Sequence, residues 1–159
     1  MGALAVAMLA AAALPHGRPL LVWNPSPSSP QGLYAIALSR GFAANDIVIA
    51  RPPAAAARLA AERGYLPRGV PLVKSVVAVE GNRMCADRNR VWVNGRNVAL
   101  RLTVDAAGRP LPWWSGCRVL AKGEALLLGL GHPASFDGRY FGPSRAGEVL
   151  GKAKLLWAA

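Results

Sequence analysis

Acidic residues are scarce in this chain. The sequence has 8 Asp and Glu against 19 Lys and Arg, which gives a net charge of +11. An excess of this size indicates either a solvated basic surface or an anionic partner. No run of five or more basic residues occurs, and no recognised nucleic-acid-binding motif is present. We therefore expect no nucleic-acid partner, and an anionic lipid surface fits the apolar N-terminus better.

Cysteine and histidine are also rare. The only cysteines, Cys85 and Cys117, lie 32 residues apart without a Cys-x-x-Cys pair, and the chain has only two histidines. This pattern argues against a zinc site, whose ligands usually come as closely spaced pairs. We expect neither a metal nor an organic cofactor. A single disulfide in an oxidising compartment stays open at this point.

Long apolar runs are absent beyond the N-terminus. Residues 1–14 carry no charge and are almost entirely Ala, Leu, Val and Met, but a bilayer-spanning helix needs roughly 20 residues. The segment also lacks the basic start of a signal peptide. After an interruption, residues 20–23 are apolar again. We predict that residues 1–23 form a membrane anchor, cut short by the choice of initiator methionine. The alternative is a buried N-terminal helix of a soluble domain.

Glycine and proline, in contrast, are plentiful. The 159 residues include 17 Gly and 13 Pro, which suits one domain of short strands joined by turns better than a helical bundle. We predict a mostly β domain over residues 24–159, with one short helix over residues 54–63 that ends at Gly64. Predicted strands cover residues 33–38, 46–50, 70–79, 124–130 and 149–156, with a hairpin over 90–100 that turns at Asn94-Gly95.

The loop over residues 24–34 combines stiffness with hydroxyl groups. It contains three prolines and a glycine, with Ser26, Ser28 and Ser29 between them. Proline restricts the backbone, so such a loop holds its side chains in place. A serine nucleophile needs a fixed position, a base within hydrogen-bond reach and donors for the oxyanion. The alternative is a Pro/Ser linker between the anchor and the domain.

Two serine mechanisms fit the residues present. A Ser-His-Asp triad would use His132 and Asp137, but no Gly-x-Ser-x-Gly elbow occurs. A Ser–Lys dyad needs a desolvated lysine whose pKa falls toward roughly 7–8. Lys74 lies inside the apolar, strand-forming segment 72–77, and no other lysine of the sequence lies in a comparable segment. The residues therefore favour Ser28 with Lys74, and the triad stays as the alternative.

Several segments resemble one protease family. Residues 28–34, Ser-Ser-Pro-Gln-Gly-Leu-Tyr, resemble the Ser-x-Pro-x-Gly-Leu-Tyr box of the TraF family, the signal peptidase-like processing proteases of conjugative transfer systems. Residues 72–78 are similar to the lysine box of that family. Later blocks match in order at residues 94–95, 108–112 and 135–143. The resemblance covers about residues 23–157 and implies the mostly β, membrane-anchored Ser/Lys architecture of type I signal peptidases.

The resemblance also implies roles for individual residues. Ser28 would be the nucleophile and Lys74 the general base. The Ser26 hydroxyl and the Ser28 backbone N–H would form the oxyanion hole. Ser135 matches the serine that orients the lysine amine.

Asp137 and Arg139 match an acidic and a basic residue that support the site in the family. The resemblance does not fix whether the Asp137 carboxylate takes part directly in the reaction. The chain departs from the family at Ser75, where arginine is usual, and in its short anchor.

The implied function is a serine endopeptidase in the bacterial inner membrane, with its catalytic domain in the periplasm. It would cut a pilin-like precursor after small residues through an acyl-enzyme, which water or an amine then resolves. One alternative is a general preprotein signal peptidase, and another is an inactive periplasmic module of a secretion apparatus. A periplasmic domain leads us to expect a Cys85–Cys117 disulfide, with two unrelated buried cysteines as the alternative.

Overall fold

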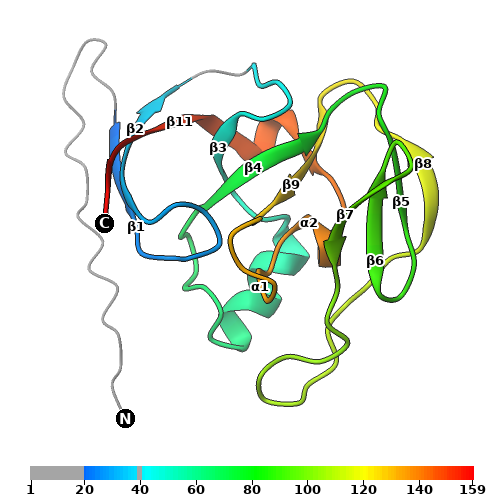
Figure 1. Cartoon of the computed structure of the whole chain (residues 1–159). Coiled ribbons are helices and arrows are strands. Elements are labelled where there is room, and N and C mark those ends of the chain that lie inside the picture. Colours follow the sequence, from blue (N-terminus) through cyan, green and yellow to red (C-terminus); the bar gives the residue numbers. More distant parts are fainter. Residues whose placement is uncertain (1–19, 39–40) are drawn as a thin grey trace.

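The computed structural model describes residues 20–38 and 41–159, and in this part of the chain the fold is mostly β (Figure 1). The expected fold class is confirmed: one helix of nine residues accompanies many short strands. In chain order the elements are β1 (Leu20–Asn24), β2 (Gly32–Ala37), β3 (Ile47–Ala50), α1 (Ala54–Glu62), β4 (Leu72–Ala78), β5 (Arg83–Ala86), β6 (Arg90–Val93), β7 (Arg96–Leu100), β8 (Gly116–Val119), β9 (Glu124–Leu128), α2 (Gly138–Phe141), β10 (Ser144–Arg145), a 3-10 turn (Ala146–Glu148) and β11 (Val149–Ala158).

The strands form two sheets. A seven-stranded sheet has the order β1-β2-β11-β3-β4-β9-β10, and a four-stranded sheet has the order β7-β6-β5-β8. Neighbouring strands within both sheets are antiparallel. The smaller sheet is built entirely from the chain between β4 and β9, and Figure 1 shows it at one end of the molecule, beyond those two strands. It is therefore an insertion between two neighbouring strands of the larger sheet.

Strand β9 lies at the centre of the core. Leu126 and Leu128 pack into the cluster beneath the smaller sheet, together with Met84 and Leu120. The alternate residue Leu127 packs on the opposite face of β9, in a cluster of the larger sheet. Both faces of this strand are buried, which explains why its sequence is a continuous apolar run instead of an alternating one.

The N-terminal prediction needs one change of boundary. Residues 1–19 of the predicted anchor lie outside the described residues. The last four, residues 20–23, lie in β1, which pairs with β2 from Leu20↔Ile36 to Asn24↔Gly32. Their exposure alternates along the strand, as a sheet requires and a membrane helix does not. Within residues 20–38 and 41–159, no helix reaches the length and apolar character needed to cross a bilayer.

The predicted hairpin at residues 90–100 is present. Asn94 and Gly95 have φ angles of 49° and 79°, the paired positive values of the tight turn that Asn-Gly favours. The sequence-based assignment missed β5, β8, β10 and the short helix α2. All four residues of β8 are exposed, so its sequence has no apolar alternation to mark it as a strand.

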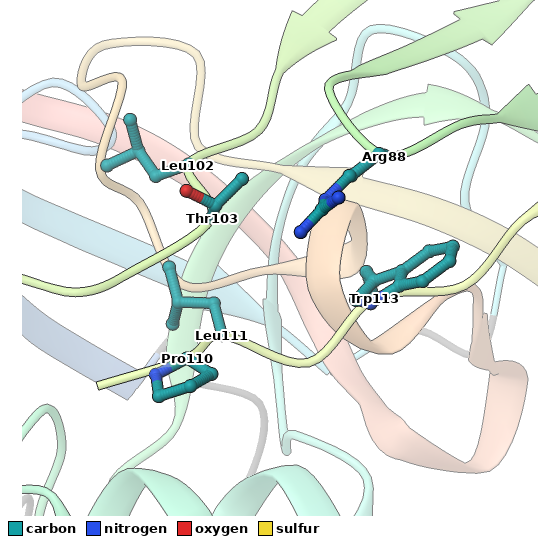
Figure 2. A pocket seen from close by; sticks show the side chains of 6 residues that line it. All are labelled: Arg88, Leu102, Thr103, Pro110, Leu111 and Trp113. Carbon is teal, nitrogen blue, oxygen red and sulfur yellow. The ribbon is translucent and has the colours of Figure 1, made fainter. Parts of the chain in front are cut away.

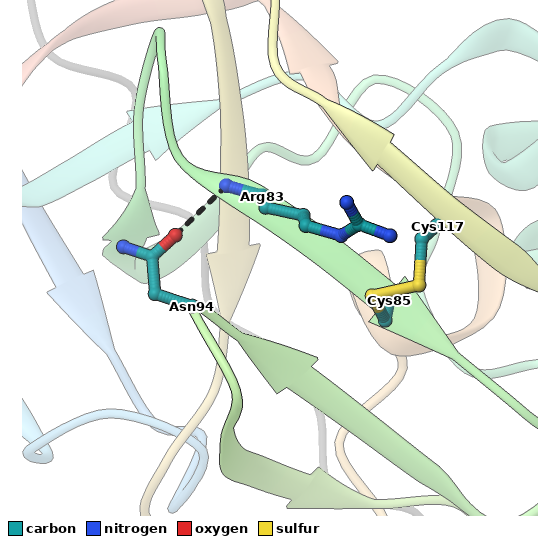
Figure 3. The surroundings of a disulfide bond; sticks show 4 residues. All are labelled: Arg83, Cys85, Asn94 and Cys117. Carbon is teal, nitrogen blue, oxygen red and sulfur yellow. Dashed lines mark hydrogen bonds between the residues drawn. A yellow bond between two sulfur atoms is a disulfide. The ribbon is translucent and has the colours of Figure 1, made fainter.

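The predicted disulfide between Cys85 and Cys117 is confirmed. The two cysteines face each other across β5 and β8, and the bond is drawn in Figure 3. On the other side of β5, the Arg83 N–H donates to the Asn94 Oδ1 at 2.9 Å, which ties the Asn-Gly turn to the same strand. The disulfide thus fixes β8, an exposed edge strand, to the rest of the smaller sheet.

The double variant Cys85→Ser with Cys117→Ser should unfold more easily than the wild type. The bond closes a loop of 32 residues in sequence separation, and constraining a loop of this length in the unfolded chain stabilises a protein by about 3–4 kcal/mol. Urea unfolding measures the difference. Reducing agent should destabilise the wild type and leave the double variant unchanged; equal unfolding midpoints for both proteins would contradict the prediction.

Candidate active site

Asn24 shapes the serine loop. Its side-chain Nδ2 donates to the carbonyl oxygens of Ser26, Ser29 and Pro30, at 3.0, 3.3 and 3.1 Å. The buried Tyr34 hydroxyl donates to the same Pro30 carbonyl at 2.6 Å. These bonds satisfy carbonyls that the proline-rich backbone leaves without intrastrand partners. The loop therefore has one conformation, and the direction of each serine side chain is set by it.

Two further bonds fix the loop to the sheet. The Ser29 hydroxyl donates to the Val73 carbonyl of β4 at 2.9 Å. The Gly131 N–H, which follows β9, donates to the Ser28 carbonyl at 3.1 Å. Ser28 is consequently held between β4 and the loop that follows β9, the neighbouring strand of the larger sheet, and the residue is 6% exposed.

Lys74 reaches Ser28 from the middle of β4. Its backbone pairs with Val48 of β3, and its side chain is 3% exposed. The Lys74 Nζ lies 2.9 Å from the Ser28 Oγ and 2.8 Å from the Ser135 Oγ. The structure therefore brings two serines to the same lysine. Ser28 lies 46 residues from Lys74 in the sequence, and Ser135 lies 61 residues from it.

The surroundings of Lys74 favour its uncharged form. Burial is the main cause that lowers the Lys74 pKa to about 8, because removal from water penalises the ammonium. The negative charge of Asp137 opposes this shift, and the positive charge of Arg139 adds to it. Roughly a tenth of the amine is then unprotonated at pH 7 and about half at pH 8, and the unprotonated form is the one that can accept a proton.

Glycines leave the space in which these side chains meet. By the register of β4 and β9, Gly129 is the position opposite Lys74, directly after β9 ends. A Cβ at Gly129 would lie 2.3 Å from the Ser135 Oγ, 2.8 Å from the Lys74 Nζ and 2.8 Å from the Ser28 Cβ. A Cβ at Gly131 would lie 2.3 Å from the Pro27 carbonyl oxygen. Neither position tolerates a side chain without displacement of the site.

Ser26 lies beside the nucleophile position. Its Oγ is 2.9 Å from the Ser28 Oγ, and it accepts a bond from the Ser28 N–H at 3.3 Å. The Ser26 N–H in turn donates to the Asn24 Oδ1 at 3.2 Å. The two groups expected to form an oxyanion hole are therefore adjacent, and in this state they bind each other.

Asp137 and Arg139 form a buried ion pair behind the lysine. The Arg139 Nε donates to the Asp137 Oδ1 at 2.8 Å, and both side chains are almost fully buried. The other carboxylate oxygen accepts the Gly129 N–H at 2.7 Å, and the Arg139 Nη2 donates to the Gly129 carbonyl at 2.9 Å. The pair thus binds both backbone polar groups of Gly129, the residue opposite Lys74.

The triad alternative is not assembled. His132 is exposed, and its Nδ1 accepts the Ala134 N–H at 3.2 Å. The carboxylate of Asp137 is occupied by Arg139 and Gly129, and Ser28 is bound by Lys74. Across residues 20–38 and 41–159, no three His, Cys, Asp or Glu side chains gather in a way that would hold a metal ion.

Two hollows are lined largely by residues of β7 or of the chain that follows it. The larger, about 220 Å³, is lined by residues of β7 and of the loop that follows β9. The smaller, about 90 Å³, lies further along the chain after β7, where Arg88 and Trp113 face Leu102, Thr103 and Leu111 (Figure 2). The larger hollow shares the 129–135 loop with Ser28 and Lys74.

Sequence reasoning identified the serines and the lysine but missed Asn24, Gly129 and Gly131. An asparagine directly before a Pro-Ser segment is a local signal for side-chain-to-backbone bonds and could have been noticed. The pair of glycines after the β9 segment was also visible. Its meaning depends on which strand lies opposite, and that is a long-range fact.

Comparisons with known proteins agree on one family. The family described as signal peptidase, peptidase S26, matches residues 1–158. A probable conjugal transfer protein TraF of Sinorhizobium fredii is 39% identical over 82% of this chain and 73% of its own length. The conjugal transfer protein TraF of Agrobacterium tumefaciens is 36% identical over 96% and 89%. The plasmid transfer protein TraF of Escherichia coli is 31% identical over 79% and 76%.

A solved signal peptidase I of Enterococcus faecalis aligns with 73% of this chain and 98% of its own, at 17% identity and a TM-score of 0.42. The assignment rests on the sequence matches, which extend over nearly the whole chain and over most of each relative. The chain belongs to the peptidase S26 family of signal peptidases and is a homologue of the TraF conjugal transfer proteins.

Proposed function

We propose that this chain is a membrane-anchored serine endopeptidase in which Ser28 is the nucleophile and Lys74 the general base. The observation that carries the proposal is the 2.9 Å approach of the Lys74 Nζ to the Ser28 Oγ, in surroundings that lower the lysine pKa to about 8. A lysine that only forms a surface ion pair needs neither a serine hydroxyl within hydrogen-bond reach nor a lowered pKa. An uncharged amine beside a fixed hydroxyl is what serine activation without histidine requires.

In the proposed reaction the Ser28 hydroxyl attacks the scissile carbonyl and gives its proton to the free amine of Lys74. The resulting ammonium then delivers this proton to the departing amine, so the C–N bond breaks and an ester to Ser28 remains. Water, or an amine, attacks that ester, and Lys74 returns a proton to the Ser28 Oγ as it leaves. One lysine therefore serves as base and acid in both halves of the cycle.

The oxyanion would be stabilised by the Ser28 N–H and the Ser26 hydroxyl. In the free site the Ser28 N–H donates to the Ser26 Oγ at 3.3 Å. A substrate carbonyl oxygen would replace the Ser26 Oγ as the acceptor, and the Ser26 hydroxyl would rotate to donate to the same oxygen. Both donors then serve the charge that develops in the transition state.

The remaining polar residues have positioning roles. Ser135, 2.8 Å from the Lys74 Nζ, directs the lone pair of the amine toward Ser28. Asp137 forms hydrogen bonds with Gly129 and Arg139, so we assign it to the support of the loop and not to proton transfer.

We further propose that the substrate is the precursor of a conjugative pilin or related exported protein, cut after small residues in the periplasm. The relatives named for conjugal transfer support the substrate class, and the disulfide suits an oxidising compartment. The Trp23 and Trp157 rings are 5.9 Å apart and exposed near the Asn24 end of β1, and exposed tryptophans suit a lipid interface. A reporter fused after Ala159 should signal the periplasm; a cytoplasmic signal would overturn this topology.

Substitution of either dyad residue should abolish cleavage. Co-expression with a candidate pilin precursor, followed by mass measurement of the product, distinguishes uncut, cut and cyclised forms. Ser28→Ala and Lys74→Ala should each leave the precursor uncut, and the double variant should be no worse, because the two groups act as a unit. Lys74→Arg should also be inactive, since a guanidinium keeps its proton.

Other serines of the chain give comparison variants for this experiment. Ser115→Ala changes an exposed serine and should cleave like the wild type. Ser29→Ala removes the bond to the Val73 carbonyl, so it should lose about 1 kcal/mol of stability but keep its activity. Ser26→Ala should lose about 10²–10³ in rate as one oxyanion donor disappears. Cleavage by Lys74→Arg would defeat the dyad.

Activity should rise with pH through a midpoint near 8. Below the Lys74 pKa of about 8 the amine is protonated and cannot accept the serine proton; above it the amine is free. The rate of Ser28 acylation by a small ester, measured between pH 6 and 10, gives the midpoint. A midpoint near that of an ordinary lysine, or a rate independent of pH, would contradict the assignment.

Gly129→Ala should inactivate the enzyme although the change adds one methyl group. The new Cβ would fall within 2.8 Å of Lys74, Ser28 and Ser135 atoms and must force them apart. Gly147→Ala is the matched control, because a Cβ there meets nothing within 4 Å. Acylation of Ser28 by the same ester, alongside thermal unfolding, measures the effect. A fully active Gly129→Ala protein would show that the contact is not needed.

A further inference from the structure

The hollow next to the candidate active site is mostly apolar. Its volume is about 220 Å³, which is below the range typical for small-molecule pockets and suits a single side chain. Its walls come from the end of β7 and from the loop after β9, and include Val98, Leu100, Leu130, His132, Pro133 and Arg139. Leu100 and Leu130 are 60% and 59% exposed. Two large apolar side chains therefore stand in water at the rim of an apolar hollow.

One loop forms both this hollow and the candidate active site. Gly129, Gly131 and Ser135 touch Ser28 or Lys74. The intervening residues Leu130 and His132 line the hollow instead. The two sites therefore share one loop, which contributes different residues to each, and consecutive residues of a polypeptide bound at Ser28 could reach both.

Arg139 ties the two walls of the hollow together. Its Nη1 donates to the Leu100 carbonyl of β7 at 3.2 Å and to the Pro133 carbonyl at 2.9 Å. The Arg139 side chain is 4% exposed and is also bound to Asp137. The hollow is thus preformed, and its shape is fixed by the same ion pair that supports the active-site loop.

Proton transfer decides which part of a substrate would lie here. Lys74 must deliver a proton to the departing amine, so that nitrogen lies within hydrogen-bond reach of the Nζ. The Nζ lies against Gly129 and Ser135 of the shared loop, whereas the proposed oxyanion donors belong to Ser26 and Ser28. The departing segment therefore leaves over the 129–135 loop, toward the hollow. Strand β7 is also an edge of the smaller sheet, and an edge strand can pair with an extended peptide.

We propose that this hollow binds the apolar side chain of the first residue after the scissile bond. The inference rests on the proposed serine mechanism. By microscopic reversibility the same hollow receives the side chain of an amine that resolves the acyl-enzyme. In that step the amine nitrogen bonds to the ester carbonyl, the bond to the Ser28 Oγ breaks, and Lys74 passes the proton from the nitrogen to the oxygen.

Partitioning of the acyl-enzyme tests the hollow directly. The full chain in detergent micelles is acylated with an N-acetyl-alanine p-nitrophenyl ester, with Ser28→Ala as the blank. Leucinamide, lysinamide or glutamic acid amide is then added, and the ratio of amide product to hydrolysed product is measured. Wild type should favour leucinamide. Leu130→Glu and, separately, Leu100→Glu place a carboxylate at the rim and should shift the lysinamide-to-leucinamide ratio at least about tenfold toward lysinamide.

The matched control is Leu38→Glu, which introduces the same charge at a 73% exposed leucine at the end of β2 and should keep the wild-type ratio. Wild-type ratios in both rim variants, with ester hydrolysis intact, would overturn the hollow and leave the Ser–Lys mechanism standing. Equal shifts in Leu38→Glu would also overturn it, as an effect of net charge. An ester that the wild type hydrolyses no faster than Ser28→Ala would overturn the mechanism and, with it, this inference.

Discussion

The burial of a lysine side chain inside a β-sheet, where the loss of water penalises its charged form, is the constraint on which the rest of the site depends. Lys74 is 3% exposed, and its burial lowers the cost of losing the proton. A buried amine still needs hydrogen-bond partners, and the Ser28 and Ser135 hydroxyls supply them at 2.9 and 2.8 Å. Hydroxyls are suited to this position because they bind a neutral amine without holding it in the charged form.

The ion pair behind the lysine follows from the same constraint. A lone carboxylate near Lys74 would stabilise the ammonium, and Asp137 does raise the lysine pKa. Arg139 is bound to that carboxylate at 2.8 Å, and its positive charge lowers the lysine pKa. The two charges act on the lysine pKa in opposite directions, and burial remains the dominant influence. The pair can therefore bind the N–H and the carbonyl of Gly129 through strong, charge-assisted hydrogen bonds without binding the lysine amine itself.

The parts of this structure that sequence could predict are those with local signals. A lysine inside a strand-forming apolar run, serines between prolines, and an Asn-Gly turn each depend on neighbouring residues. The contact between Gly129 and Lys74 depends on the register of β4 against β9, which no local pattern fixes. Strand β8 is exposed along its whole length and so lacks apolar alternation. It was missed for that physical reason, although the disulfide that anchors it was foreseen.

The site is assembled from three segments that lie far apart in sequence: the serine loop, β4 and the loop after β9. Gly131 binds the Ser28 carbonyl and Ser29 binds the Val73 carbonyl, so each segment positions another. Loss of one contact should loosen the others, because they share partners. The 129–135 loop also lines the hollow beside β7. Glycine at 129 and 131 leaves room for Ser28 and Lys74, while Leu130 between them lines the hollow.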